Sequence, residues 1–280
     1  MSTDVATLEK PWKEYTFVAF DTETSGQYPI VDEIVEIGMI KWRGGQIIDR
    51  YQTLIKPSKP MGEAVIKIHG ITNEMVEHSP AINDKINEIY DFLNGSVVIA
   101  HHAPFDLGFL TYEFEKFRKP LFSDTAVCTS LLARALIQSP NHRLQTMVKL
   151  LNINHEQAHR AESDAEACLQ LAFHCMNLVG ANATLKQVVK AQKRTLWWQD
   201  YSLKTVENNQ KWRGFMEALH EGKNVEFVYE AGTHKGKPRQ AKPIGVVRNP
   251  DGDYFPALCL IDNVVKRFYM NKISDSLIIN

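Results

Sequence analysis

Two carboxylates stand at the end of an apolar stretch near the N-terminus, and their types and spacing suit metal chemistry. Residues 17–20 are Phe-Val-Ala-Phe, and Asp21, Thr22 and Glu23 follow. The stretch predicts a buried strand, and because strand side chains repeat every two residues, Asp21 and Glu23 point to the same face. Such a pair of hard oxygen ligands suits Mg²⁺ or Mn²⁺. An acid pair at a strand end is also typical of a solvated edge or a helix cap, so the pair alone leaves both interpretations open.

Two later stretches contain further residues that suit the same chemistry. Residues 97–100 predict a second apolar strand, which a turn connects to Phe105 and Asp106 at the start of a helix. Further on, His159 precedes Asp164 by five positions, at the start of a long stretch with apolar residues at helical spacing. The three stretches together supply four carboxylates and one histidine, which favours the metal site over the solvated edge.

Three motifs, taken together, resemble those of the DEDDh exonucleases, the DnaQ-like group that contains RNase T and the proofreading subunits of bacterial replicative polymerases. The motifs are Asp-x-Glu, an acid preceded by phenylalanine, and a histidine five positions before an aspartate. The positions that match them here are Asp21, Glu23, Phe105, Asp106, His159 and Asp164. The resemblance covers about residues 15–178 and implies an α/β fold of the ribonuclease-H-like type with a mixed sheet. In that fold the first and fourth strands are neighbours, which would bring the first three acids together, and the last helix would place Asp164 at the same point.

The resemblance implies metal-dependent hydrolysis of phosphodiester bonds from the 3′ end of single-stranded DNA or RNA. Two divalent cations, Mg²⁺ or Mn²⁺, would neutralise the phosphodiester, activate water and stabilise the leaving oxygen. Their ligands would be Asp21, which bridges both, together with Glu23, Asp106 and Asp164. His159 would be the general base, because the ordinary pKa of imidazole is about 6.5. A single histidine at a helix entrance is otherwise typical of a cap or a hydrogen-bonded core group.

The residues around the first two motifs are expected to hold the end of the substrate. In the family the backbone after the first motif binds the terminal 3′ hydroxyl, and Thr24 and Gly26 match these positions. Phe105 is expected in the same substrate-binding region. Two positions depart from the family pattern: Gln27 replaces a common leucine that wedges against the last base, and His102 replaces an asparagine. These departures leave the metal ligands untouched but change the expected contacts with the substrate.

The remaining pattern of the first part predicts further strands and helices. Apolar stretches on either side of Gly44-Gly45 predict a hairpin over residues 34–40 and 46–56. The other expected strands are residues 15–21, 96–100 and 122–125. Helices are expected over residues 81–93, 107–117, 128–137, 144–151 and 160–179. Thr72 is expected to cap a helix that begins at the next residue.

Composition places the chain among ordinary soluble globular proteins with more than one domain. Its 280 residues are 44% hydrophobic and 23% charged, and the net charge is −1. The four cysteines form no Cys-x-x-Cys pair, so reduced core residues are expected rather than zinc ligands. No apolar run approaches the about 18 residues of a membrane helix, and the N-terminus lacks a signal-peptide core. We therefore expect no membrane association and a cytoplasmic location.

Three parts are expected along the chain: an exonuclease domain over residues 1–184, a basic helical linker over 185–206 and a β-rich domain over 207–280. Residues 186–206 hold five bases and one acid, and Leu185 to Trp198 is expected to be a helix that ends with two tryptophans. Interleaved bases and aromatic rings suit single-stranded nucleic acid. A helix that docks its tryptophans between two domains is the alternative, and it is preferred.

The last part changes to a period of two after a helix near residues 207–220. The expected strands are residues 225–229, 244–248, 254–261 and 264–269, with a turn at 249–252. They predict a small SH3-like β-barrel. The segment resembles the WYL domain, a ligand- or nucleic-acid-sensing module, at Arg267-Phe268 and Lys272-Ile273, although Tyr254-Phe255-Pro256 replaces the namesake Trp-Tyr-Leu.

Basic residues of this last part are the expected accessory contacts to nucleic acid. Lys235, Lys237, Arg239 and Lys242 fall within eight residues between two expected strands, and Arg267 lies on a later strand. A barrel groove with such residues suits the phosphates of a single strand, and a solvated loop is the alternative. A small ligand or a protein partner of the WYL-like part is also left open.

A non-catalytic module that only grips nucleic acid, or that regulates, is the alternative function for the whole chain. An inactive relative would most readily lose a metal ligand, and this chain keeps all four. The sequence therefore favours a 3′→5′ exonuclease, and it leaves the choice between DNA and RNA open.

Overall fold

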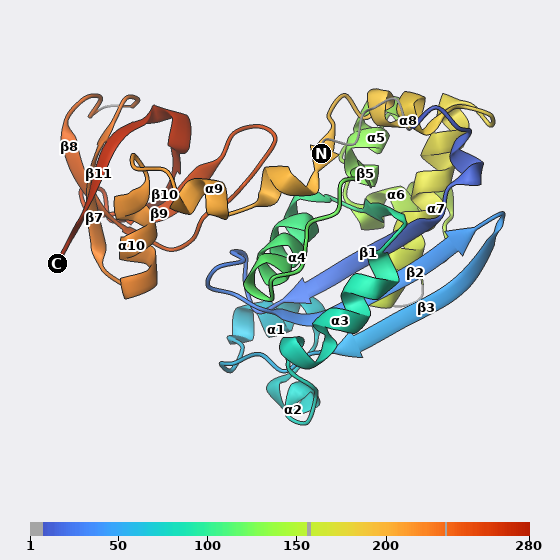
Figure 1. Ribbon diagram of the computed structural model, residues 1–280, viewed down its shortest axis with the longest axis horizontal. Helices are drawn as coiled ribbons and strands as arrows, with labels where there is room; N and C mark the ends of the chain where they lie inside the picture. The colour runs from blue at the N-terminus through green and yellow to red at the C-terminus, as the bar shows by residue number, and fades with distance from the viewer. Residues whose placement is uncertain (1–7, 156–157, 233) are drawn as a thin grey trace. The chain divides into compact units, whose positions relative to one another are not determined.

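A mixed six-stranded sheet forms the centre of the larger part of the molecule (Figure 1). The structure is a computed structural model that describes residues 8–155, 158–232 and 234–280. The strands are β1 (Phe17–Thr24), β2 (Ile34–Arg43), β3 (Gln46–Leu54), β4 (Val97–Ala100), β5 (Thr125–Cys128) and β6 (Leu196–Trp197). Their order is β3-β2-β1-β4-β5-β6, in which β1–β4 and β4–β5 are parallel and the other pairs antiparallel. The predicted mixed sheet, with the first and fourth strands adjacent, is confirmed.

The centre of this sheet is apolar on both faces, whereas its β3 edge is open to solvent. The residues 17–20 of β1 and all of β4 are buried. A strand that is covered on both faces carries a continuous apolar run rather than an alternation, which explains why residues 17–20 contain no polar side chain. Most of β3 is exposed and polar, as suits an edge strand.

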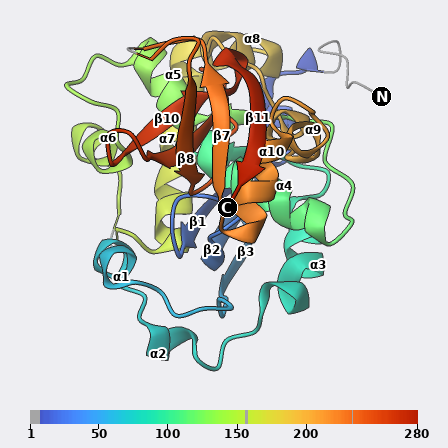
Figure 2. The same ribbon diagram turned by 90° about the vertical axis from the view of Figure 1, so that its left-hand side faces the viewer.

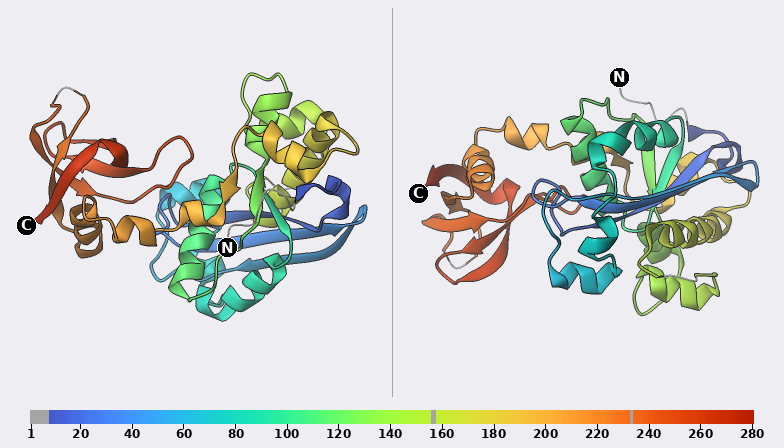
Figure 3. Two further views of the ribbon diagram at one scale, coloured as in Figure 1. Left: turned by 45° about the horizontal axis from the view of Figure 1, so that its top comes forward. Right: turned by 90° about the horizontal axis from the view of Figure 1, so that it is seen from below.

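Helices cover both faces of the sheet. They are α1 (Glu63–His69), α2 (Asn73–Val76), α3 (Ile82–Leu93), α4 (Pro104–Lys116), α5 (Thr129–Leu136), α6 (Leu144–Leu151), α7 (Ala161–Val179) and α8 (Leu185–Ala191). Figure 3 shows α7 on one face of the sheet and α3 and α4 on the other. Gly38 lets α7 approach β2 closely, because a Cβ at this position would lie 2.1 Å from the backbone nitrogen of Glu162. The first turn of α7 is therefore held against the sheet.

The chain after α8 differs from the helix predicted over Leu185 to Trp198. The amide oxygen of Gln192 accepts a hydrogen bond from the backbone of Cys128 at 3.0 Å, which ties this segment to β5. β6 then pairs with β5, so the chain continues as a strand. Trp198 is buried, with its ring 5.1 Å from that of Phe122. This burial supports a packing role for Trp198 rather than base stacking.

The described chain divides into two compact units. One comprises Glu33–Gln199 and the segment that ends at Gly26, and the other comprises Gln27–Asp32 and Asp200–Asn280. The domain limits expected from the sequence, after residues 184 and 206, stay a prediction. In the described part of the chain, no helix has the length and apolar character needed to span a membrane.

The second unit contains an all-antiparallel sheet with the order β10-β9-β8-β7-β11 (Figure 2). Its elements are α9 (Lys204–Glu207), α10 (Arg213–Glu221), β7 (Asn224–Tyr229), β8 (Pro238–Pro243), β9 (Tyr254–Cys259), β10 (Val264–Tyr269) and β11 (Ile273–Ile279). The predicted β-rich architecture is confirmed, with three differences. Residues 244–248 are not a strand, because only Val247 makes a bridge, to Tyr254. The strand β8 was not predicted, because its basic residues indicated a loop. The strand β11 was not predicted either, because it is a partly exposed edge strand without clear apolar alternation.

The prediction that Arg239 belongs to an exposed basic loop is wrong. Arg239 lies in β8, its residue surface is 6% exposed, and its guanidinium lies 5.4 Å from the centre of the Phe268 ring. Strand side chains alternate, so Arg239 points to the buried face while Lys242 points to solvent. Lys237 and Arg267 are also exposed. Three of the four predicted accessory cations are therefore accessible.

Candidate active site

All five residues predicted to form the catalytic centre line a single cleft of about 490 Å³. They come from three separate segments of the first unit. Asp21 and Glu23 lie near the end of β1, and Asp106 lies in the first turn of α4. His159 precedes α7, and Asp164 lies in the first turn of that helix. The tertiary fold therefore brings together the acids and the histidine that the motifs indicated.

Asp106 is attached to β1 by two hydrogen bonds from one residue. The backbone N–H and the hydroxyl of Thr22 both donate to Oδ1 of Asp106, at 3.1 and 2.7 Å. Thr22, which stands between Asp21 and Glu23 in the sequence, is buried, and Asp106 is only 3% exposed. These bonds fix the start of α4 at the end of the parallel β1–β4 pair. Asp106 keeps its second oxygen for another partner.

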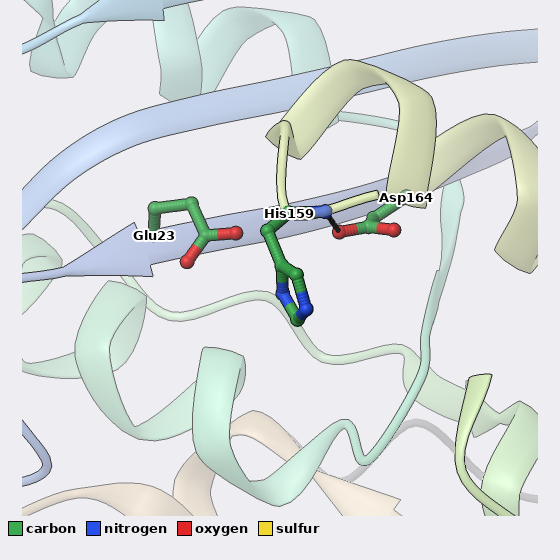
Figure 4. A group of neighbouring side chains, drawn as sticks. All are labelled: Glu23, His159 and Asp164. Atoms are coloured by element: carbon green, nitrogen blue, oxygen red, sulfur yellow. Dashed lines mark hydrogen bonds between the residues drawn. The ribbon is translucent and has the colours of Figure 1, made fainter. Parts of the chain in front are cut away.

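Glu23, His159 and Asp164 form the tightest part of the cluster (Figure 4). One ligand atom from each lies within 4.8 Å of the others. The backbone N–H of His159 donates to Oδ2 of Asp164 at 3.0 Å, which leaves the imidazole ring free to point into the cleft. His159 has a φ of 62°, a left-handed conformation that is unusual for a residue with a side chain. The surrounding contacts must hold this turn, because it is strained on its own.

His155 also binds Asp164, a contact that was not predicted from the sequence. Its Nε2 lies 2.6 Å from Oδ1 of Asp164, and both side chains are almost fully buried. Because a carboxylate oxygen only accepts, this nitrogen carries the proton. Each oxygen of Asp164 retains a lone pair for a further ligand. A histidine nine positions before an acid follows no simple pattern, so the sequence offered no signal for this contact.

An ion pair between the buried Glu36 and the partly exposed Arg160 holds the turn that carries His159. Glu36 of β2 is fully buried and accepts from Nη2 of Arg160 at 2.7 Å and from the backbone N–H of Ala161 at 3.0 Å. Gln52 donates to the same carboxylate at 2.8 Å. Arg160 follows His159 directly, and Ala161 is the first residue of α7, so Glu36 fixes the histidine turn and the helix start together. Glu36 is the single charged residue in the apolar stretch of residues 34–40, and this was a signal that could have identified it.

The cluster of acids is electrostatically costly without a cation. Burial raises the pKa of Asp21 well above its usual range, and the charges of Asp106, Asp164 and Glu23 raise it further. Burial, with the neighbouring charge of Asp164, raises the pKa of Glu23 to about 8. Burial also raises the pKa of Asp106 to about 7, although the hydrogen bonds from Thr22 oppose this shift. Carboxylate oxygens that lie close together despite their mutual repulsion form a donor set that fits a divalent cation.

The residues expected to hold the substrate end are placed differently from one another. Phe105 lines the cleft and packs against Phe109, with 5.0 Å between ring centres. His102 also lines the cleft, in a left-handed conformation with a φ of 66°. Thr24 is buried, and its hydroxyl donates to the backbone oxygen of Gly26 at 2.6 Å. The expected roles of Thr24 and Gly26 in binding the terminal 3′ hydroxyl, and of Phe105 in binding the substrate, stay predictions.

Comparison with known proteins identifies the family. A profile of the RNase_T family, described as exonuclease, matches residues 18–172. The chain belongs to this exonuclease family. The exonuclease domain is 38% identical over 155 residues to a PolC-type DNA polymerase III of Oceanobacillus iheyensis, which covers 55% of this chain and 11% of that protein. The chain thus spans about a tenth of the length of this relative. The predicted resemblance to DnaQ-like 3′→5′ exonucleases is confirmed.

Solved structures show the same fold. Exonuclease X in complex with 5′ overhanging duplex DNA is 27% identical, with a TM-score of 0.51 over 63% of this chain and 99% of that one. A zinc-bound complex of E. coli ExoI with single-stranded DNA is 18% identical, with a TM-score of 0.53 over 94% of this chain and 65% of that one. The second likeness concerns the fold alone, and its coverage extends beyond the exonuclease domain into the second unit. Exonucleases of this family use divalent metal ions, in agreement with the acid cluster.

Proposed function

We propose that the exonuclease domain removes nucleotides from the 3′ end of single-stranded DNA or RNA, with two divalent cations, Mg²⁺ or Mn²⁺, as cofactors. The observation that carries this proposal is the cleft lined by Asp21, Glu23, Asp106, Asp164 and His159. The similar solved structures contain single-stranded DNA in one case and duplex DNA with an overhang in the other. Both complexes contain DNA, which supports a nucleic-acid substrate for this chain.

Asp21, Glu23, Asp106 and Asp164 would hold the cations through their carboxylates. Cations bound there supply charge neutralisation for the phosphodiester, activation of water and stabilisation of the leaving 3′ oxygen. Asp106 is oriented by Thr22, and Asp164 by His155 and the backbone of His159, so the ligands are held before substrate arrives. Such preorganisation lowers the cost of binding the ions in the geometry that the reaction needs.

His159 would act as the general base. Its imidazole points into the cleft beside Glu23, where it can take a proton from the attacking water. The Glu36–Arg160 pair and the hydrogen bond from the His159 N–H to Asp164 hold the backbone of His159. Only the side-chain bonds of His159 are then left to rotate the ring. Thr24 and Gly26 would hold the terminal 3′ hydroxyl through their backbone, and Phe105 would pack against the last nucleotide.

Lys237, Lys242 and Arg267 of the second unit would act as accessory contacts to the phosphates of longer strands. All three are exposed, whereas Arg239 is buried and is left out of this role. The WYL resemblance of this unit rests on its sequence motifs, and a ligand or a protein partner is the alternative occupant. Exposed cations suit a weak contact that depends on salt concentration.

A single assay tests the proposed activity. The purified protein is incubated with a 5′-labelled 20-nucleotide strand of DNA or RNA, with Mg²⁺ or Mn²⁺. Stepwise shortening to a ladder of labelled products is expected, because the 5′ label stays on the strand while nucleotides leave from the 3′ end. A matched strand with a blocked 3′ end, such as a terminal phosphorothioate, serves as the control. Folded protein that yields no ladder with either metal would instead favour the non-catalytic binding module.

A further inference from the structure

The cleft has a second wall that differs in charge from the acid cluster. Besides the residues already described, its lining includes Arg134 of α5 and the residues 141–145 that lead into α6. We define the basic wall as Arg134, Asn141, His142, Arg143 and Gln145. Arg134 and Arg143 are exposed, and within the described residues neither belongs to an ion pair. Both guanidinium groups are therefore available to a ligand in the cleft.

The segment that presents Arg143 is held in one conformation by its own hydrogen bonds. The side-chain oxygen of Asn141 accepts from the backbone N–H of Arg143 at 3.1 Å and from the hydroxyl of Thr146 at 2.7 Å. The ring of His142 bonds to the backbone oxygen of Ile137 at 2.9 Å. These contacts close the loop on itself ahead of α6. These hydrogen bonds make the loop an ordered part of the rim of the cleft.

His101 ties this loop to the catalytic strand. Its Nε2 lies 3.0 Å from the backbone oxygen of His142, and its Nδ1 lies 2.9 Å from the hydroxyl of Thr129. His101 follows β4 directly, and β4 pairs with β1, which carries Asp21. The basic wall and the acid cluster are therefore connected through the same parallel strands.

The lining of the cleft continues from the basic wall into the first turn of α6. Leu144 and Gln145 are the first two residues of this eight-residue helix, and both line the cleft. N–H groups in the first turn of a helix have no acceptor within the helix, and they bind anions readily. Arg143, at the cap position, and Arg134 bring two forked guanidinium groups, which match the geometry of a phosphate.

Charge decides how a polyanionic strand can lie in this cleft. The acid cluster repels phosphates, and only bound cations can reverse this for the phosphate that is cleaved. The neighbouring phosphates need positive groups elsewhere, and Arg134 and Arg143 supply these within the described lining of the cleft. We propose that the basic wall binds the phosphates on the 5′ side of the scissile bond, in the part of the strand that is retained. This inference rests on the proposed exonuclease function.

A comparison of two substrates tests the basic wall. The p-nitrophenyl ester of thymidine 5′-monophosphate contains the scissile phosphate but no retained strand, whereas a 10-nucleotide strand contains both. In the double variant Arg134→Gln/Arg143→Gln, kcat/KM for the strand should fall by roughly 5–50-fold more than for the ester, mainly through KM. Lys149→Gln is the matched control, because Lys149 is an exposed cation of α6 that does not line the cleft. This control should change neither value more than twofold.

Binding provides a second readout that does not need catalysis. The fluorescence anisotropy of the labelled 10-nucleotide strand is measured in Ca²⁺ over a range of salt concentrations. The double variant should bind more weakly at low salt, and the slope of log affinity against log salt should fall by about 0.7 for each lost phosphate contact. Equal affinities and slopes for the variant and the native chain would overturn the inference. Equal losses on the ester and the strand would also overturn it.

The two tests separate the failure of this inference from that of the proposed function. A native chain that cleaves neither the ester nor the strand contradicts the exonuclease proposal, while the anisotropy measurement still decides whether the wall binds phosphates. A native chain that cleaves both, with a double variant that behaves identically, contradicts the wall alone.

Discussion

The two units of this chain differ in how their charged side chains are arranged. In the first unit, four acids from three segments converge in one cleft, where burial and mutual repulsion raise their pKa values. In the second unit, Lys237, Lys242 and Arg267 lie at exposed positions. Gathered like charges are costly and persist when a bound ion compensates them, whereas separate solvated cations cost little and attract weakly. Substitutions should therefore have large effects in the first unit and small effects in the second.

Removal of a metal ligand should have the largest effect. Asp106→Ala should remove both metal binding and hydrolysis, because the variant lacks the carboxylate that Thr22 holds in the acid cluster. Isothermal titration calorimetry with Mn²⁺ and the ladder assay measure the two losses. Asp91→Asn, on an exposed position of α3, should leave both unchanged. Asp106→Ala protein that still binds Mn²⁺ at the native affinity would remove Asp106 from the ligand set.

Loss of the histidine should have a smaller and different effect. His159→Ala should slow hydrolysis by roughly 10²–10⁴-fold, the usual contribution of a positioned base, while metal affinity stays close to native. His78→Ala, an exposed histidine after α2, is the control. The geometry also allows His159 to be a metal ligand, because one ring nitrogen of His159 and one carboxylate oxygen from each of Glu23 and Asp164 lie within 4.8 Å of one another. Calorimetry that shows no metal binding by His159→Ala would establish that role instead.

The stability of the metal-free protein should fall between about pH 7 and pH 8.5. A carboxyl group whose pKa is raised on folding stabilises the fold below its ordinary pKa, and this contribution is lost as the pH rises through the folded value. The pKa of Asp106 is raised to about 7 and that of Glu23 to about 8. Burial lowers the pKa of His101 to about 4, so this histidine is largely neutral in both states over this range and adds little to the slope.

Thermal unfolding with a chelator measures this effect. The midpoint should fall by about 2–6 °C over the stated range, and Mg²⁺ or Mn²⁺ should raise it again at pH 8.5. Asp106→Asn should make the pH dependence shallower, because one of the titrating groups is gone. A midpoint that rises over this range in the chelator would contradict the prediction.

The accessory cations of the second unit should have the smallest effect. The triple variant Lys237→Gln/Lys242→Gln/Arg267→Gln should bind a 40-nucleotide strand a few-fold more weakly at low salt, because each exposed contact is worth little. The loss should shrink at 300 mM salt, and the rate on an 8-nucleotide strand should not change. If the triple variant binds the long strand as tightly as the native chain, a small ligand or a protein partner becomes the better explanation for this unit.

The site residues were predictable because their signals are local. Asp21 and Glu23 share a strand, and their spacing of two places both side chains on one face. His159 and Asp164 lie at one helix entrance, where the family motif indicated them. The adjacent first and fourth strands followed from the family resemblance. The contacts of Asp164 with His155 and of Glu36 with Arg160 were not predicted. The two partners in the second pair are 124 positions apart, and no short pattern connects them.

The sequence by itself determined which chemical groups the chain carries and how the short segments present them. These segments are an apolar strand that ends in two acids, and a helix entrance with a histidine before the helix and an acid in its first turn. Only the tertiary structure decided which polar groups are buried. It placed Glu36 fully out of water beside Arg160, and it turned Arg239 toward Phe268 rather than toward solvent. The physical reason is that desolvation depends on neighbours from distant parts of the chain, which local periodicity does not contain.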